Sequence, residues 1–369
     1  MLVDTREDNY TGQPVRGENA GGCYNGPTGE IRSMRKLKFG ACIFAQKPMP
    51  EVVRTAQLAE ELGYDSLWIA DSQVLCRELY VTLTACALGT SRIKLGAGVT
   101  APYTRHVSVT ASAFASLNEL APGRVILGVS TGNSLVRTIG RRPARIAEME
   151  EYVGKLTDLL DSRETDFDSG VRGGISWLDG PTQVPIYVAG TGPKMLRAAT
   201  RATSNIILMA GSGPAFVRAG LDTVHAGMRE AGKDPSEARV IMWTPFAIAE
   251  DGVVAREHAS KHVASLLSRV DPDLFDEEDR EAIERIRKGF SPYPHDPNAP
   301  KNPGGVPDKF IDQLALAGTP DEMRAQVEKM ATVSGFDTVV LNTQASNGKF
   351  TSLEKSLELF ADGVIGRFG

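Results

Sequence analysis

The alternation of apolar segments along the chain constrains the fold most strongly. From about residue 37 to the end of the 369-residue chain, eight short apolar segments alternate with stretches whose apolar residues recur at helical spacing. The segments expected to form strands are residues 37–44, 65–71, 93–99, 124–130, 185–190, 205–211, 239–250 and 337–343. Strands that are mostly apolar and are separated by helices are typical of a parallel sheet covered on both faces. The pattern therefore predicts an α/β fold, a closed (β/α)8 TIM barrel with insertions.

An open, doubly wound sheet is the alternative fold for the same alternation. That fold typically has a Gly-x-Gly-x-x-Gly turn after the first strand, but this chain has Ala45-Gln46-Lys47-Pro48 there. We therefore prefer the barrel.

The chain departs from the repeat at its beginning and in two insertions. Residues 1–35 are polar and glycine-rich without a period, which predicts an N-terminal tail or surface arm. Residues 36–369 are expected to form a single barrel domain, with insertions at about 162–183, holding at most a short hairpin, and at about 252–310. Within the second insertion, residues 291–307 are too rich in proline and glycine for regular structure. A loop of that length is typical of a lid over a functional site.

Composition argues against several classes of protein. The net charge is -5, from 41 basic and 46 acidic residues, which argues against nucleic acid as a partner. No apolar run approaches a membrane span, and the first residues lack the order of a secretory signal. The four cysteines form no close pair and no metal-ligand spacing with the five histidines. We therefore expect a reduced, cytoplasmic protein with no membrane partner and no metal.

Polar residues follow each predicted strand, and in a barrel the carboxyl ends of the strands meet at one rim. The rim contains glycines, hydroxyls and amides but little histidine or acid, which argues against a metal-dependent hydrolase and against a Ser-His-Asp arrangement. Such groups suit a flat, hydrogen-bonding, anionic cofactor. Among the charged residues, Asp71 has the strongest case for a functional role because it directly follows a strand. Arg105 and His106 are interpreted as a surface pair at the start of a helix.

The segment Gly190-Thr191-Gly192-Pro193-Lys194-Met195 is the sharpest local motif. A glycine turn that opens directly into a helix presents free N–H groups and the positive end of the helix dipole, which together can bind phosphate. Lys194 in the first turn runs against the usual dipole preference, yet it fits if an anion is bound there. The alternative is an ordinary turn with a surface lysine. Ser212-Gly213-Pro214 repeats the pattern one unit later.

Two glycines, Gly96 and Gly98, lie inside the third predicted strand. Glycine in a strand interior usually marks a bulge or a place where a ligand approaches the backbone closely. A kinked strand with an ordinary loop is the alternative. Trp68 and Trp243 are interpreted as packing residues rather than as surfaces on which a ligand stacks.

Five segments carry a resemblance to a known family. They are residues 66–71, 77–83, 92–106, 123–128 and 189–196. In these segments the chain resembles the luciferase-like superfamily of flavin- and deazaflavin-dependent oxidoreductases. It is most similar to the branch that contains the coenzyme F420-dependent methylenetetrahydromethanopterin reductases.

The resemblance implies a barrel that assembles as a homodimer or homotetramer and that uses coenzyme F420 or FMN, with a slight preference for F420. It implies a non-prolyl cis peptide at Gly98–Val99 behind the central ring of the flavin. Candidate cofactor-binding residues are Gly98, Val99, Thr100, Thr131, Gly190, Thr191, Gly192, Pro193, Lys194 and Met195. Candidate catalytic residues are Asp71, Ser72 and Asn133.

Two positions depart from the pattern of the family. Many relatives carry histidine where this chain has Ser72, and some deazaflavin enzymes carry a glutamate proton donor where it has Asn133. A hydroxyl and an amide cannot act as general acid and base near neutral pH, so a proton must come from elsewhere or is not needed.

The sequence thus predicts an oxidoreductase that transfers a hydride between coenzyme F420 and a small organic substrate. A reduced-FMN-dependent monooxygenase that uses molecular oxygen is the nearest alternative, and oxygen consumption separates the two. A non-catalytic flavin-binding barrel is the second alternative, which steady turnover of any substrate would remove.

Overall fold

The computed structural model describes residues 36–270, 272–289, 305–343 and 350–368. The arm predicted for residues 1–35 and most of the lid predicted for residues 291–307 lie outside the described residues. Arg35–Gly369 form one compact unit.

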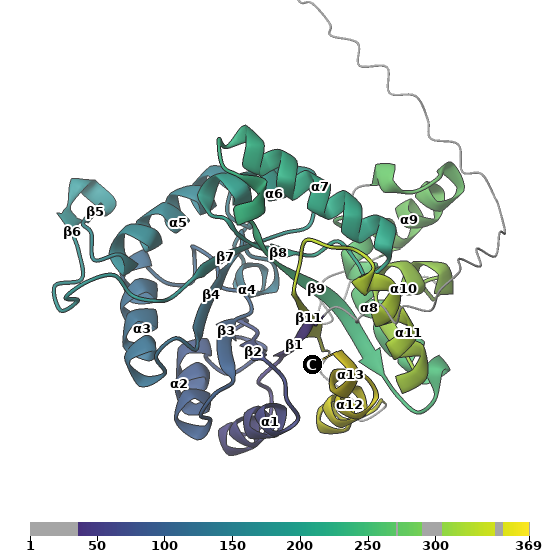
Figure 1. Ribbon diagram of the computed structural model, residues 1–369. Coiled ribbons are helices and arrows are strands. Elements are labelled where there is room, and N and C mark those ends of the chain that lie inside the picture. Colours follow the sequence, from purple (N-terminus) through teal and green to yellow (C-terminus); the bar gives the residue numbers. More distant parts are fainter. Residues whose placement is uncertain (1–35, 271, 290–304, 344–349, 369) are drawn as a thin grey trace, which may run out of the picture. The chain divides into compact units, whose positions relative to one another are not determined.

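Eight parallel strands close into a barrel with helices around it (Figure 1). They are β1 (Lys38–Ile43), β2 (Ser66–Ile69), β3 (Lys94–Ala97), β4 (Val125–Val129), β7 (Ile186–Gly190), β8 (Asn205–Leu208), β9 (Arg239–Ile248) and β11 (Thr338–Asn342). Each strand pairs with the next in this order, and β11 pairs with β1, so the ring of hydrogen bonds is complete. The eight predicted strands and the barrel are confirmed, and closure excludes the open sheet.

The helices that follow the strands cover the outside of the barrel. They are α1 (Met49–Glu61), α2 (Leu79–Gly89), α3 (Val107–Leu120), α5 (Ile146–Leu160), α6 (Pro193–Ala202), α7 (Pro214–Glu230), α11 (Pro320–Ala331), α12 (Leu353–Phe360) and α13 (Gly366–Phe368). The short helix α4 (Ser134–Arg137) lies instead at the pocket described below. Each long helix buries one side; α5, for example, buries Met149, Val153 and Leu156 at helical spacing. No helix of the described residues is both long and apolar enough to cross a membrane.

The two insertions differ in size. The first contains the short antiparallel pair β5 (Thr165–Asp166) and β6 (Arg172–Gly173), as predicted. The second contains α8 (Gly252–Leu267), α9 (Glu277–Gly289), α10 (Asp308–Leu314) and β10 (Leu316–Gly318). Its helices lie together beside β9 (Figure 1). They share an apolar cluster of their own, which includes Val263, Leu267, Phe275, Phe310 and Ile311.

β9 is longer than the other barrel strands because its last residues pair with a strand of the second insertion. Its first half pairs with β8 and β11 inside the barrel. Its last residues, from Phe246 to Ile248, pair with β10. The sequence predicted the length of this segment but not β10, which is only three residues long.

Two tryptophans are the largest side chains of the apolar cluster that also contains Ile126, Ile207 and Val340. Trp68 and Trp243 are buried, and their ring centroids lie 5.4 Å apart in an edge-to-face arrangement. Both rings pack in the barrel as predicted, and Trp243 also lines the pocket described below. A Cβ at Gly96 would collide with the Trp68 ring, and one at Gly98 would lie 2.8 Å from Trp243 Cη2. The two glycines of β3 and its end therefore make room for these rings.

Candidate active site

A pocket of about 570 Å³ lies at the carboxyl ends of the barrel strands. Of the predicted site residues, ten line it: Asp71, Ser72, Gly98, Val99, Thr131, Asn133, Gly190, Thr191, Gly192 and Met195. Three do not. Thr100 is fully buried behind Asp71, Pro193 begins α6, and the Lys194 side chain is exposed outside the lining.

The peptide bond between Gly98 and Val99 is cis, as the resemblance implied. Both residues line the pocket, directly past the end of β3. The backbone on each side is held by the neighbouring strands. The Gly98 N–H donates to the Ile69 carbonyl at 2.8 Å, and the Thr100 N–H donates to the Gly128 carbonyl at 2.9 Å.

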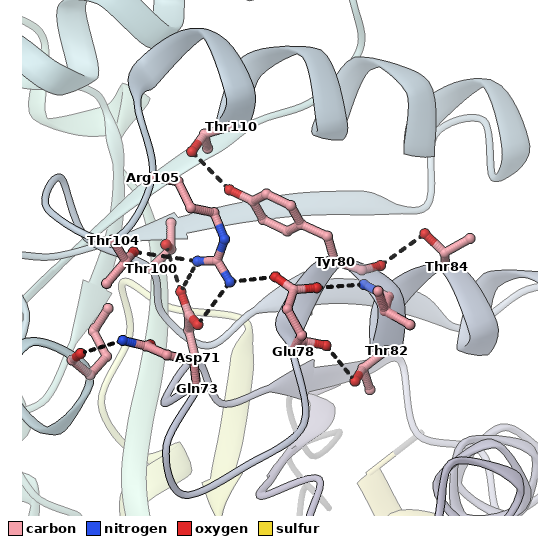
Figure 2. Close-up of polar contacts among 12 residues, drawn as sticks. Asp71, Gln73, Glu78, Tyr80, Thr82, Thr84, Thr100, Thr104, Arg105 and Thr110 are labelled. Carbon is pink, nitrogen blue, oxygen red and sulfur yellow. Dashed lines mark hydrogen bonds and ion pairs between the residues drawn. The ribbon is translucent and has the colours of Figure 1, made fainter. Parts of the chain in front are cut away.

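Asp71 forms an ion pair with Arg105. Its Oδ2 accepts hydrogen bonds from Arg105 Nη1 at 2.7 Å and from Thr100 Oγ1 at 2.8 Å, and its Oδ1 accepts from Arg105 Nη2 at 3.3 Å (Figure 2). Arg105 also donates to Glu78 Oε1 at 2.5 Å and lies over the Tyr80 ring. Asp71 therefore positions the loops after β2 and β3 around the pocket.

The interpretation of Arg105 as a surface residue is wrong. Its side chain is only 12% exposed because it fills the space between Asp71 and Tyr80. His106 is exposed, as expected, and its ring accepts a hydrogen bond from the Ser108 N–H at the start of α3.

The residues after β4 supply neutral hydrogen-bonding groups to the pocket. Thr131 and Asn133 line it, and within the described residues their side chains make no hydrogen bond. Ser72 is buried, and its hydroxyl donates to Ser134 Oγ at 3.3 Å. Free amide and hydroxyl groups of this kind suit the polar edge of a planar ligand.

The turn Gly190-Thr191-Gly192 lines the pocket and brings backbone N–H donors to it. Within the described part of the chain, the N–H groups of Thr191, Gly192 and Lys194 make no backbone hydrogen bond. A Cβ at Gly192 would find its nearest atom, the Arg269 carbonyl oxygen, at 3.9 Å, so the space beside the turn is open. The turn and the positive end of the ten-residue helix α6 thus form a place for an anion.

The second turn of this type does not offer an anion site, so the repetition of the motif was misleading. The N–H groups of Ser212 and Gly213 donate to the Gln313 carbonyl at 3.2 and 2.8 Å. Ser212 Oγ donates to the Ala315 carbonyl at 2.7 Å. The backbone at the end of α10 and at Ala315 therefore occupies the position that an anion would take.

One wall of the pocket was not found from the sequence. It consists of His262, Ser265, Leu266 and Arg269, from α8 and the residues just past its end. The Arg269 guanidinium donates to the carbonyl and hydroxyl of Ser265, and no carboxylate among the described residues forms an ion pair with it. The spacing of these four residues marks one helix face, but no rule for a single sequence says which face meets a pocket. We call this set the α8 wall.

Comparison with known proteins identifies the family. Residues 35–338 match the family model for luciferase-like monooxygenases. The chain belongs to this family. A 5,10-methylenetetrahydromethanopterin reductase from Methanolobus tindarius is 31% identical over 339 residues, which are 89% of this chain and 100% of that protein. The resemblance found in the sequence is therefore confirmed, and the protein is an oxidoreductase of the luciferase-like type.

Two further relatives carry the name of a coenzyme. An F420-dependent glucose-6-phosphate dehydrogenase from Kineococcus radiotolerans is 36% identical over 188 residues, 46% of this chain and 56% of that protein. The solved structure of the coenzyme F420 dependent tetrahydromethanopterin reductase from Methanopyrus kandleri superposes with a TM-score of 0.70 at 24% identity, over 90% of this chain and 100% of that chain. The latter match shows the shared fold.

Proposed function

We propose that the protein transfers a hydride between coenzyme F420 and a small organic substrate held in the pocket. One observation carries this proposal: the same pocket has the Gly98–Val99 peptide in one part and the open turn Gly190–Gly192 in another. A flat ring system joined to a phosphate fits both features. The F420-dependent relatives support this coenzyme.

Different residues would contact the ring and the phosphate of such a coenzyme. Gly98 and Val99 would support the ring, and the free side chains of Thr131 and Asn133 would donate or accept hydrogen bonds at its edge. The turn at Gly192 would hold the phosphate through backbone N–H groups, in the open space beside the turn. When bound, the coenzyme supplies the group that accepts or donates the hydride. The protein binds, orients and shields it.

A reduced-FMN-dependent monooxygenase is the second candidate. The family model is named for monooxygenases, and FMN also carries a ring and a phosphate. Oxygen consumption with reduced FMN would favour this candidate over the first.

The turn at Gly192 provides a direct test. Gly192→Asp places a negative charge against the proposed phosphate and should abolish binding of coenzyme F420 in a fluorescence titration. Gly192→Ala is the matched control, because a Cβ fits at this position without a close contact. It should bind far more tightly than Gly192→Asp. If Gly192→Asp and the wild type bind coenzyme F420 with equal affinity, the turn at Gly192 is not the phosphate site.

The proposal includes a homodimeric or homotetrameric assembly and a cytoplasmic location without nucleic-acid or membrane partners. Support for the assembly comes from exposed apolar side chains on the adjacent helices α2 and α3, namely Val81, Leu88, Val109 and Leu120. Apolar side chains grouped on a surface often mark a contact between proteins. Light scattering of the purified protein measures the assembly directly.

A further inference from the structure

Arg137 is the last residue of the short helix α4, next to the turn proposed to bind the phosphate. Helix α4 follows β4, and the turn at Gly192 follows β7. These two strands pair, with Val129 opposite Val188, so the segments that leave them enter the rim side by side. Arg137 and the turn line the same pocket.

The Arg137 side chain lies on the side of α4 that faces the pocket. Residues three apart share one side of a helical turn, and Ser134 is three residues before Arg137. The Ser134 hydroxyl accepts a hydrogen bond at 3.3 Å from Ser72, which is buried and also lines the pocket. The Arg137 N–H donates to the Asn133 carbonyl and its carbonyl accepts from the Gly140 N–H, both at 2.9 Å. The part of Arg137 that remains for the pocket is therefore its side chain.

Arg137 is exposed, and its guanidinium forms no hydrogen bond or ion pair within the part of the chain that the structure describes. Arg142, a few residues later, is by contrast paired with Glu148 through hydrogen bonds of 2.9 and 2.8 Å. The other arginine of the pocket lining, Arg269, donates to the carbonyl and hydroxyl of Ser265. Arg137 therefore brings unused donors to the pocket.

The pocket also has an excess of positive charge. Among the described residues that line it, Asp71 is the one acidic residue, and Arg105 neutralises it. Residues 137–145 include four arginines and no acidic residue. A free guanidinium in such surroundings suits a ligand with phosphate or carboxylate oxygens, because its planar set of donors matches two of these oxygens at once.

We propose that Arg137 binds an anionic group of the coenzyme through charge-assisted hydrogen bonds at the rim, next to the turn at Gly192. This inference rests on the proposed function, because it takes the ring and the phosphate to lie where that function puts them. Coenzyme F420 has two kinds of anionic group, its phosphate and the carboxylates of its glutamate tail. Arg137 would add a charged side chain to an anion site that otherwise consists of backbone N–H groups.

The first test compares coenzyme F420 with its uncharged deazaflavin fragment, which has the ring and the ribityl chain but neither phosphate nor tail. Arg137→Met should weaken binding of the coenzyme about 10-fold in a fluorescence titration and leave the affinity for the fragment unchanged. Arg137→Lys should retain part of the affinity, because the charge remains while the paired donors are lost. Arg141→Met, at an exposed position of the same loop outside the pocket lining, is the matched control and should bind as the wild type does.

The second test repeats the titrations of the wild type and Arg137→Met with coenzyme F420 at low and high concentrations of potassium chloride. Salt screens the attraction between exposed charges, so the difference in affinity between the two proteins should shrink at high salt. A difference that salt does not change would overturn the proposal, because it would show that Arg137 acts through packing rather than through its charge.

The length of the glutamate tail identifies the anionic group. If Arg137→Met weakens binding equally for coenzyme F420 with one glutamate and with several, the partner is the phosphate. If the loss grows with the length of the tail, the partner is a tail carboxylate. Both results support the contact.

The remaining outcomes separate this inference from the proposed function. Wild-type affinity for coenzyme F420 in Arg137→Met, or an equal loss for the coenzyme and the fragment, would overturn the role of Arg137 while the proposed function stands. A wild-type protein that does not bind coenzyme F420 would remove the proposed function and this inference with it.

Discussion

At the scale of single residues, the sequence located the pocket but not the partners of its side chains. A position directly after a strand predicted that Asp71, Ser72 and Asn133 meet at the rim, and all three line the pocket. Spacing could not show that Arg105 neutralises Asp71, because the two lie 34 residues apart and meet only when two loops fold together. It also could not find His262, whose place depends on the docking of the insertion.

The Asp71–Arg105 pair gives a prediction at this scale. Arg105→Met removes the partner of a carboxylate whose side chain is 1% exposed. We expect a loss of about 3–5 kcal/mol in the free energy of unfolding, because a buried charge is left uncompensated. Urea denaturation measures the loss. The double variant Asp71→Asn/Arg105→Met should recover part of it, and a loss below about 1 kcal/mol in Arg105→Met would contradict this account of the pair.

At the scale of elements, hydrophobic periodicity predicted the barrel strands and its outer helices because each has one consistent apolar pattern. The second insertion is different. Val263, Leu266 and Leu267 of α8 pack into the apolar cluster of the insertion, and Leu266 also lines the pocket. Periodicity therefore identifies the apolar side of the helix but not which of its residues reach the pocket. The sequence did not predict β10 because a strand of three residues is too short to show a hydrophobic period.

The entry into β3 depends on the last turn of α1. Glu60 Oε1 accepts hydrogen bonds from the N–H groups of Ser91, Arg92 and Ile93 at 3.0, 2.6 and 2.8 Å. Burial alone would raise the pKa of Glu60, but these hydrogen bonds lower it to about 2. The carboxylate therefore stabilises the fold above its ordinary pKa of 4.5, and this contribution is lost as the pH falls toward about 2.

We expect Glu60→Gln to lower the free energy of unfolding at pH 7 by about 1–2 kcal/mol, because hydrogen bonds to a charged acceptor become bonds to a neutral one. The difference from wild type should shrink as the pH falls from about 4.5 toward about 2. Urea denaturation at several pH values measures it. Glu61→Gln, at the exposed neighbouring position, serves as the control. A difference that stays constant with pH would rule out the carboxylate as its source.

At the scale of the whole molecule, the pocket is a product of barrel closure and of the second insertion together. Closure through β8 and β9 brings the strand ends into one rim. The insertion then adds the α8 wall and fills the turn at Ser212 with its own backbone. The sequence predicted the rim because strand order implies it, whereas the contacts of the insertion arise only from tertiary packing.

The central claim is that this pocket holds a deazaflavin coenzyme, and a titration of the purified full-length protein with coenzyme F420 and with FMN tests it most directly. The fluorescence of each compound reports its binding. The account predicts saturable binding of coenzyme F420, with FMN unable to displace it at comparable concentration. Binding of FMN alone, or of neither compound, would contradict it.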